Sequence, residues 1–121
     1  MTDATTIAER YLAVWNETDA ERRRALITEA WTESCTYVDP LMRGEGPDAI
    51  EALVAGVQQR FPDFQFRLLG AANGFGNYVR FSWQLGPANA DGPIQGTDFV
   101  ELADGRIRRV TGFLDRVPDG A

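Results

Sequence analysis

Residues 78–85, with the sequence YVRFSWQL, decide the fold class of the second half of this 121-residue chain. Apolar side chains occupy every second position, at Val79, Phe81, Trp83 and Leu85. Side chains on a β-strand alternate between its two faces, so a period of two indicates a strand with one buried face. The stretch therefore predicts a long strand whose other face is more polar.

Shorter stretches with the same period surround this strand. We expect further strands at residues 64–68, 94–102 and 106–115. The glycine-rich segment 70–76 is expected to form a turn, and segment 86–93 a long loop that is a candidate lid. Asp104 and Gly105 are a strong hairpin signal between the last two strands. Together these elements predict an antiparallel meander.

The first half of the chain is expected to contain three helices. The pattern Thr-x-x-Glu, which is typical of a capping box, occurs at residues 6–9 and 18–21. We expect these two sites to begin the first and second helices, and the second helix to run to about Trp31. Residues 46–47, Gly-Pro, open the third helix with proline at its first position.

Three helices followed by an antiparallel meander define an α+β fold, and the length suits a single domain over residues 1–121. A curved sheet that wraps around helices encloses a cone. The open mouth of such a cone is a natural pocket for a small molecule.

The composition narrows the partners and the location. The net charge of −6 argues against nucleic acid, whose phosphates bind a basic surface. The sequence contains no run of about 18 apolar residues, so no membrane span is expected. The polar start at residues 1–3 does not resemble a signal peptide. The single Cys35 leaves no intrachain disulfide and suits a reducing cytoplasm. All 12 basic residues are arginine, which suggests a high-GC bacterial genome.

The absence of histidine and lysine restricts the chemistry. Imidazole bases and Schiff bases are excluded, so acid–base catalysis must use carboxylates, phenols or Cys35. Asp39 is the most informative carboxylate, because it closes the strand-like run 35–38 and Pro40 holds it in an extended conformation. No carboxylate cluster is patterned for a metal, and no phosphate-binding loop occurs, so neither metal nor cofactor is expected.

Four segments, in this order and spacing, resemble the NTF2-like, or SnoaL-like, superfamily. They are RYLAVWNETD at residues 10–19, TYVDP at 36–40 with Gly44 and Gly46 behind it, GTDFV at 96–100 and DGRI at 104–107. The resemblance covers residues 5–115 approximately. It implies an NTF2-like cone, in which three N-terminal helices pack against a curved, mostly antiparallel sheet.

Three positions resemble the ketosteroid isomerases of that superfamily. The resemblance implies that Asp39 removes a proton next to a ketone, while Tyr11 and a neutral Asp98 hydrogen-bond the enolate oxygen. The strand period supports a buried Asp98, because Asp98 shares its face with Ile94, Gly96, Val100 and Leu102. Burial among apolar groups would raise the pKa of its carboxyl group.

Each of these residues also has a purely structural interpretation. Tyr11 could be a core residue, and Asp39 could cap a turn through its side chain. Asp98 would be an ordinary polar position if the face that carries Phe99 were the packed one. Arg80 could form an ion pair with Asp98 or Asp115. A pair with Asp98 would lower the pKa of that carboxyl group, which the isomerase hypothesis needs raised.

Four further residues are candidates for substrate binding: Arg80, Trp15, Trp83 and Asp115. Arg80 and Asp115 also resemble the residues with which limonene epoxide hydrolases activate water. Ser82 stands where the second carboxylate of that site is expected, so this activity ranks lower. Cys35 has no histidine to activate it and is expected to pack in the core.

The sequence therefore predicts a pocket for a small, mostly apolar molecule, with isomerase-like or cyclase-like proton transfer next to a carbonyl. The alternative is a non-catalytic ligand-binding or assembly module with the same fold. We also expect a homodimer, because both faces of strand 94–102 carry apolar residues and an apolar outer face needs covering.

Overall fold

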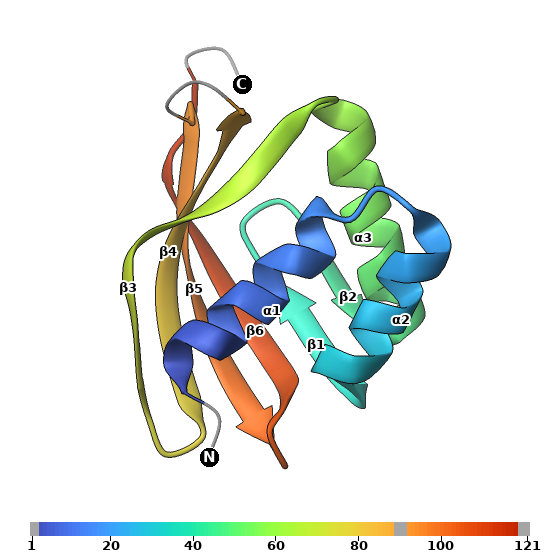
Figure 1. The fold of residues 1–121 in the computed structure, drawn as a ribbon, viewed down its shortest axis with the longest axis vertical. Coiled ribbons are helices and arrows are strands. Elements are labelled where there is room, and N and C mark those ends of the chain that lie inside the picture. The colour runs from blue at the N-terminus through green and yellow to red at the C-terminus, as the bar shows by residue number, and fades with distance from the viewer. Residues whose placement is uncertain (1–2, 89–91, 119–121) are drawn as a thin grey trace.

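A computed structural model describes residues 3–88 and 92–118 as three helices and a six-stranded sheet (Figure 1). The elements in chain order are α1 (Ala4–Asn16), α2 (Ala20–Ala30), β1 (Trp31–Val38), β2 (Arg43–Glu45), α3 (Pro47–Arg60), β3 (Phe64–Phe75), β4 (Tyr78–Pro87), β5 (Ile94–Ala103) and β6 (Arg106–Arg116). None of the described helices is long and apolar enough to cross a membrane.

The sheet has the strand order β2-β1-β6-β5-β4-β3. Strands β3 to β6 form an antiparallel meander, and β1 joins it through a parallel pairing with β6. The sheet is curved and does not close, and the helices gather on one of its faces (Figure 1). The predicted α+β cone is confirmed.

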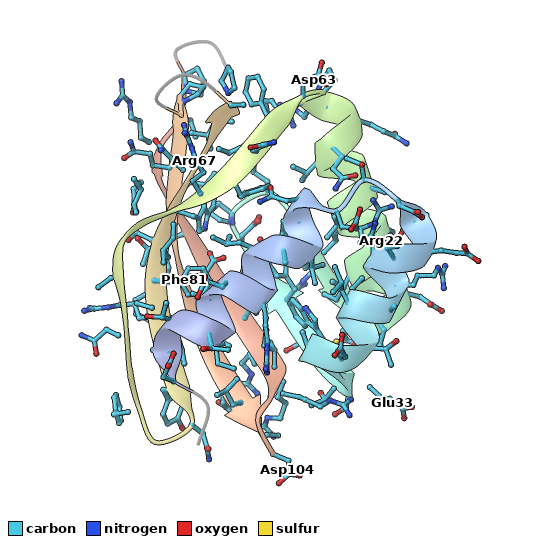
Figure 2. All side chains as sticks on the ribbon, in the orientation of Figure 1. Arg22, Glu33, Asp63, Arg67, Phe81 and Asp104 are labelled. Carbon is cyan, nitrogen blue, oxygen red and sulfur yellow. The ribbon has the colours of Figure 1, made fainter. Side chains whose placement is uncertain are left out.

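The alternation that predicted β4 is confirmed by burial. Val79, Phe81, Trp83 and Leu85 are each no more than 8% exposed, and they belong to the core beneath the helices. Phe81, labelled in Figure 2, packs against Tyr11 of α1 with the two ring centroids 5.2 Å apart. The meander and the first helix therefore share one core.

Aspartates, and not the predicted threonines, cap the first two helices. The side chain of Asp3 accepts the N–H of Thr6, and that of Asp19 accepts the N–H of Glu21. The prediction that Thr6 and Thr18 are the caps was wrong, because aspartate caps a helix as well as threonine does. The start of α3 is confirmed, with Gly46 at φ +84° before Pro47.

Segment 70–76 does not form the predicted turn. Strand β3 continues to Phe75 through an irregular register between Leu69 and Asn73, where Gly70 takes φ +69°. Glycine permits this conformation without ending the strand, so the abundance of glycine is a poor turn signal here. The hairpin at Asp104 and Gly105 is confirmed, with positive φ at both residues.

Two boundaries around the loops also differ from the prediction. Strand β1 begins at Trp31, directly after α2, and the short β2 was not predicted. Strand β4 extends to Pro87, so the expected loop 86–93 is shorter. Residues 89–91, the centre of the candidate lid, lie outside the described residues.

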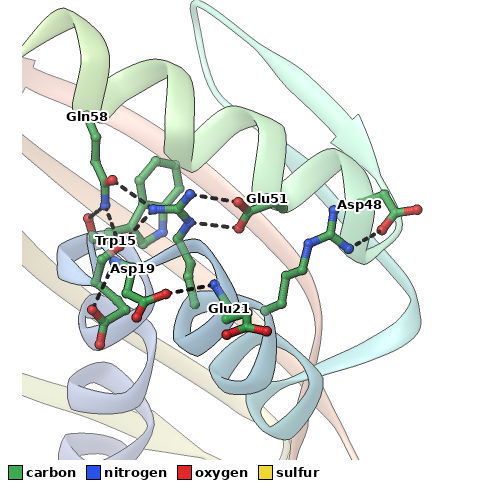
Figure 3. Close-up of polar contacts among 9 residues, drawn as sticks. Trp15, Asp19, Glu21, Asp48, Glu51 and Gln58 are labelled. Carbon is green, nitrogen blue, oxygen red and sulfur yellow. Dashed lines mark hydrogen bonds and ion pairs between the residues drawn. The ribbon is translucent and has the colours of Figure 1, made fainter.

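A buried ion pair joins α2 to α3. Arg23 is 5% exposed, and its guanidinium donates two hydrogen bonds of 2.7 Å to the Glu51 carboxylate (Figure 3). It also donates to the Glu17 carbonyl and to Gln58 of α3. Gln58 in turn donates to the carbonyls of Trp15 and Glu17, so the hydrogen-bond network extends to the end of α1. One arginine thus links all three helices.

Truncating Arg23 should destabilise the protein strongly. Arg23→Ala leaves the Glu51 carboxylate without its partner inside the helix layer, and such a loss typically costs about 3–5 kcal/mol of unfolding free energy. Urea unfolding measures the difference. Arg24→Ala is the matched control, because Arg24 makes an exposed ion pair with Asp48 that should contribute less than about 1 kcal/mol. Equal losses in the two variants would contradict the central position of Arg23.

Candidate functional site

A cavity of about 260 Å³ lies between α1, the end of α3 and the inner face of the sheet. Its wall is mostly apolar, with two carboxylates and two phenols among the lining side chains: Asp39, Asp98, Tyr11 and Tyr37. Ligand pockets usually measure roughly 300–1,000 Å³, so this cavity suits a small ligand.

Asp39 lies directly after β1 and is half-buried. Its Oδ1 accepts the backbone N–H groups of Leu41 and Met42, at 2.8 and 2.9 Å, and its Oδ2 accepts the Tyr37 hydroxyl at 2.6 Å. The side chain therefore caps the turn before β2 and also lines the cavity. The two interpretations of Asp39 coexist, because they use different oxygens.

Tyr37 is a site residue that no sequence pattern predicted. It is 5% exposed and packs against Trp15, with the ring centroids 5.8 Å apart. Burial, together with the charges of Asp98 and Asp39, raises the pKa of its phenol far above the ordinary value. Tyr37 is therefore a proton donor at neutral pH. The available signal was its position two residues before Asp39 on the same strand face.

Asp98 lies on the inner face of β5 and is 2% exposed. Burial raises the pKa of its carboxyl group to about 6, against the effect of hydrogen bonding from Tyr11 and Trp83. The negative charges of Asp39 and Asp115 raise it further. The prediction that Asp98 lies on the buried face of β5 is confirmed, since Phe99 on the opposite face is 44% exposed.

Tyr11 projects from α1 into the same region. It is 2% exposed and lies beside Asp98 and Tyr37, close enough to interact electrostatically with both. Burial is the largest cause that raises its pKa, so this phenol also stays protonated. Its ring packs on Trp31 and Phe81, so Tyr11 is a core residue that presents its hydroxyl to the cavity.

Glycines on neighbouring strands make room for these side chains. Gly112 pairs with Asp98 across the β5–β6 ladder, and a Cβ there would lie 2.8 Å from Asp98 Oδ1 and 3.3 Å from Asp39 Cβ. Gly96 likewise lies under the indole of Trp83, where a Cβ would collide with the ring. These two glycines were a sequence signal for the site, since glycine inside a strand often marks a close approach of other groups.

Trp15 and Trp83 line the cavity, as their candidacy for substrate binding requires. Arg80 and Asp115 do not, and the prediction that they face the pocket was wrong. Arg80 alternates with buried Val79 and lies on the outer face of the sheet. Asp115 also lies there and accepts the Thr97 hydroxyl at 2.6 Å.

The outer position of Arg80 and Asp115 removes the basis for epoxide hydrolase chemistry.

Arg109 and Thr111, two polar residues of β6, line another hollow on the outer face. Among the described residues, no group of three or more histidine, cysteine, aspartate or glutamate side chains could hold a metal. Cys35 is buried, and burial raises the pKa of its thiol.

The mouth of the cavity contains residues that no sequence pattern identified. Arg60 and Phe61 come from the end of α3, with the Arg60 guanidinium 5.5 Å from the Phe61 ring centroid. Leu41 follows Asp39 and Pro40 and is 72% exposed. These residues come from separate segments, so their convergence depends on the tertiary fold.

This fold and site define a cone-shaped, NTF2-like pocket protein. The model of the SnoaL-like domain matches residues 8–110, so the chain belongs to the SnoaL-like family. A crystal structure of a proposed SnoaL-like isomerase from Agrobacterium tumefaciens is 51% identical, with a TM-score of 0.90 over 95% of this chain and 99% of that chain. No curated protein matches the chain.

More distant structures share the fold. A proposed ketosteroid isomerase from Kribbella flavida is 21% identical, with a TM-score of 0.70 over 98% of this chain and 82% of that chain. A proposed SnoaL-like polyketide cyclase from Jannaschia is 18% identical, with a TM-score of 0.70 over 95% and 90% of the two chains.

The raised pKa of Asp98 should appear in the pH dependence of stability. Between pH 3.8 and about 6 the folded state keeps a proton that the unfolded chain has lost, so the free energy of unfolding should fall as pH rises. The total effect is up to about 3 kcal/mol. Asp98→Asn should remove this slope and be neutral or stabilising at pH 7. Urea unfolding across this range tests it, and a destabilised variant at pH 7 would contradict the raised pKa.

Proposed function

We propose that the cavity catalyses proton transfer next to the carbonyl of a small, mostly apolar substrate, as an isomerase or cyclase does. The observation that carries this proposal is that two carboxyl groups face one apolar cavity from different environments. Asp39 is half-buried and accepts backbone N–H groups, whereas Asp98 is fully buried with a pKa of about 6. Two carboxyl groups in such different environments are suited to the roles of base and acid.

In this mechanism Asp39 removes the proton. Its Oδ1 is occupied by two backbone N–H groups, so Oδ2 is the oxygen with a free lone pair. A base must come within about 3 Å of the proton that it takes, directly or through one water. The α-carbon of the substrate would therefore lie over Oδ2 of Asp39.

Tyr11 and Asp98 would stabilise the enolate oxygen. Both are almost excluded from water, and in such surroundings a hydrogen bond to a developing charge is strong. Asp98 must be protonated to donate. Its pKa of about 6 leaves it mostly ionised at pH 7 in the free site, and a ligand that displaces water from the cavity would raise this value further.

A non-catalytic binding module is the second candidate function. The observation that favours it is that the Asp39 carboxylate already accepts three N–H or O–H groups. Each donor occupies a lone pair that could otherwise accept a proton from a substrate. The cavity would then recognise a ligand oxygen through Tyr11 without turnover.

Asp39→Asn should abolish the exchange of α-protons in an enolisable ketone. General base catalysis supplies a factor of about 100–10,000, so exchange should fall by at least about 100-fold while ligand binding is retained. Tyr11→Phe should slow exchange by a smaller factor than Asp39→Asn, because Asp98 remains as a second donor. Deuterium exchange into a panel of cyclic ketones, followed by NMR, measures both effects and does not require the natural substrate.

The matched control is Asp48→Asn, which removes an equivalent charge from an exposed position on α3. It should exchange at the wild-type rate. Wild-type protein that binds the ketones but does not exchange their protons would favour the binding module.

We also propose that two copies pair through the outer face of the sheet. Phe99 and Phe113 are 44% and 52% exposed and stack edge to face, with Phe75 and Tyr78 exposed on the neighbouring hairpin. Monomeric proteins rarely expose a large contiguous apolar surface.

Sedimentation should therefore detect a particle of twice the 13.4 kDa chain mass at micromolar concentration. Phe99→Glu should dissociate it, because the variant places a charge in the apolar contact. The exposed Phe75→Ser change, at the hairpin tip, should have the smaller effect. A wild-type mass of 13.4 kDa would contradict pairing.

A further inference from the structure

Four ionisable side chains form a continuous series in the cavity, in the order Asp98, Tyr11, Tyr37 and Asp39. Tyr37 donates to Asp39 Oδ2 at 2.6 Å. Tyr11 lies beside both Tyr37 and Asp98 and interacts electrostatically with each of them. All four line the same cavity, and they come from α1, β1, β5 and the turn after β1.

The two carboxyl ends of this series converge on one place in the sheet. Above Gly112 of β6, a single point at the Cβ position lies 2.8 Å from Asp98 Oδ1 and 3.3 Å from Asp39 Cβ. The glycine therefore allows two carboxyl-bearing side chains to approach each other in a wall that is otherwise apolar.

We propose that Asp39 and Asp98 share one proton through the hydroxyls of Tyr37 and Tyr11. With the proton on Asp98, the donors run from Asp98 to Tyr11, from Tyr11 to Tyr37 and from Tyr37 to the Asp39 carboxylate. A shift of three protons by one hydrogen bond each reverses the series and places the proton on Asp39. Both arrangements contain the same atoms and charge, and every oxygen of the series keeps a partner in each.

Charges around the series are consistent with a single shared proton. The groups that face Asp98 are Tyr11 from α1, Tyr37 and Asp39 from the β1 region, Trp83 from β4, and the charge of Asp115 across the sheet. None of these is a cation, and among the described residues that line the cavity the only cation is Arg60 at the mouth. Two adjacent carboxylates without a cation favour keeping one proton between them.

The shared proton would return the site to its starting state after each enolisation in which the enol leaves the cavity. This consequence rests on the proposed function. Asp39 takes the α-proton, whose C–H electron pair becomes the C=C bond of the enol. Asp98 gives its proton to the carbonyl oxygen, which gains the O–H bond as the O–H bond of Asp98 breaks. The proton on Asp39 then passes through Tyr37 and Tyr11 to Asp98.

Asp39 cannot make this delivery by moving, because backbone N–H groups hold its Oδ1. Asp98 cannot readily recover a proton from water, because it is 2% exposed. Tyr37 supplies the missing path. It acts through Asp39 and is therefore a positioning residue, whose hydroxyl also carries the proton.

Carboxyl NMR of ¹³C-labelled aspartate tests the shared proton without any substrate. In the wild type, the Asp39 carboxyl signal should show a step at the same pH as the main step of Asp98, near 6. In Tyr37→Phe, which keeps the ring but removes the hydroxyl, the Asp39 step should shrink severalfold. A step of equal size in both proteins would show that charge alone couples the two groups, and would overturn the proposal.

Kinetics of enol formation, with a ketone whose enol is released from the site, test the return path. Tyr37→Phe should lower kcat by at least about tenfold with little change in KM, and added small buffer acids should restore part of the rate. The wild type and Tyr78→Phe, a variant of a 51% exposed tyrosine, should not respond to buffer. An unchanged kcat, or a loss that buffer does not restore, would show that Tyr37 is no part of a proton path.

The two tests separate this inference from the proposed function. If wild-type protein exchanges no α-protons, the proposed function fails, while the NMR experiment still decides whether the proton is shared. If exchange occurs and depends on Asp39, but the NMR steps are independent of Tyr37, then the shared proton alone is excluded.

Discussion

The Arg23–Glu51 ion pair is the contact on which the geometry of the cavity depends. The attraction between the two charges is offset by the cost of removing both of them from water, so a buried pair is weak evidence for stability by itself. Its geometry is more informative. The guanidinium uses all three of its nitrogens, on Glu51, on Gln58 and on the Glu17 carbonyl (Figure 3). Several hydrogen bonds from one planar group fix the relative orientation of the helices as well as the distance between them.

This fixed orientation reaches the cavity through the backbone. Gln58 hydrogen-bonds the carbonyl of Trp15, at the end of the helix that carries Tyr11. The same helix α3 supplies Arg60 and Phe61 to the mouth. The placement of the phenol over the sheet and the width of the entrance are therefore set together.

The sequence predicted the parts of this protein that local chemistry determines. Strand β4 followed from the alternation of Val79 to Leu85, and the inward direction of Asp98 followed from the same period on β5. The start of α3 and the final hairpin followed from residues whose backbone preferences are distinctive, Pro47 and Gly105. These predictions succeeded because each feature is determined by residues that are close together in the sequence.

The failures have equally physical causes. Arg80 and Asp115 were assigned to the pocket from their positions along the strands, without knowledge of which face of each strand is buried. A shift of one residue moves a side chain to the opposite face of the sheet. In β6 the register shifts between the pairs Glu101–Arg109 and Leu102–Ile107, so Arg108 has no place in the alternation. Tyr37 was missed for another reason. Its importance depends on Asp39, Tyr11 and Asp98 from separate elements, and no local pattern contains that contact.

The turn after β1 explains why a structural and a chemical role can belong to one carboxylate. Two backbone N–H groups take one oxygen of Asp39 and fix the side chain, and the second oxygen is bound by Tyr37 beside the cavity. A base held in this way cannot follow its substrate, so the substrate must be brought to it. Specificity must then lie in the walls that orient the ligand, above all the indoles of Trp15 and Trp83 and the segments at the mouth. The fixed element of such a site is the position of the base, and variation in the mouth would change the substrate without changing the chemistry.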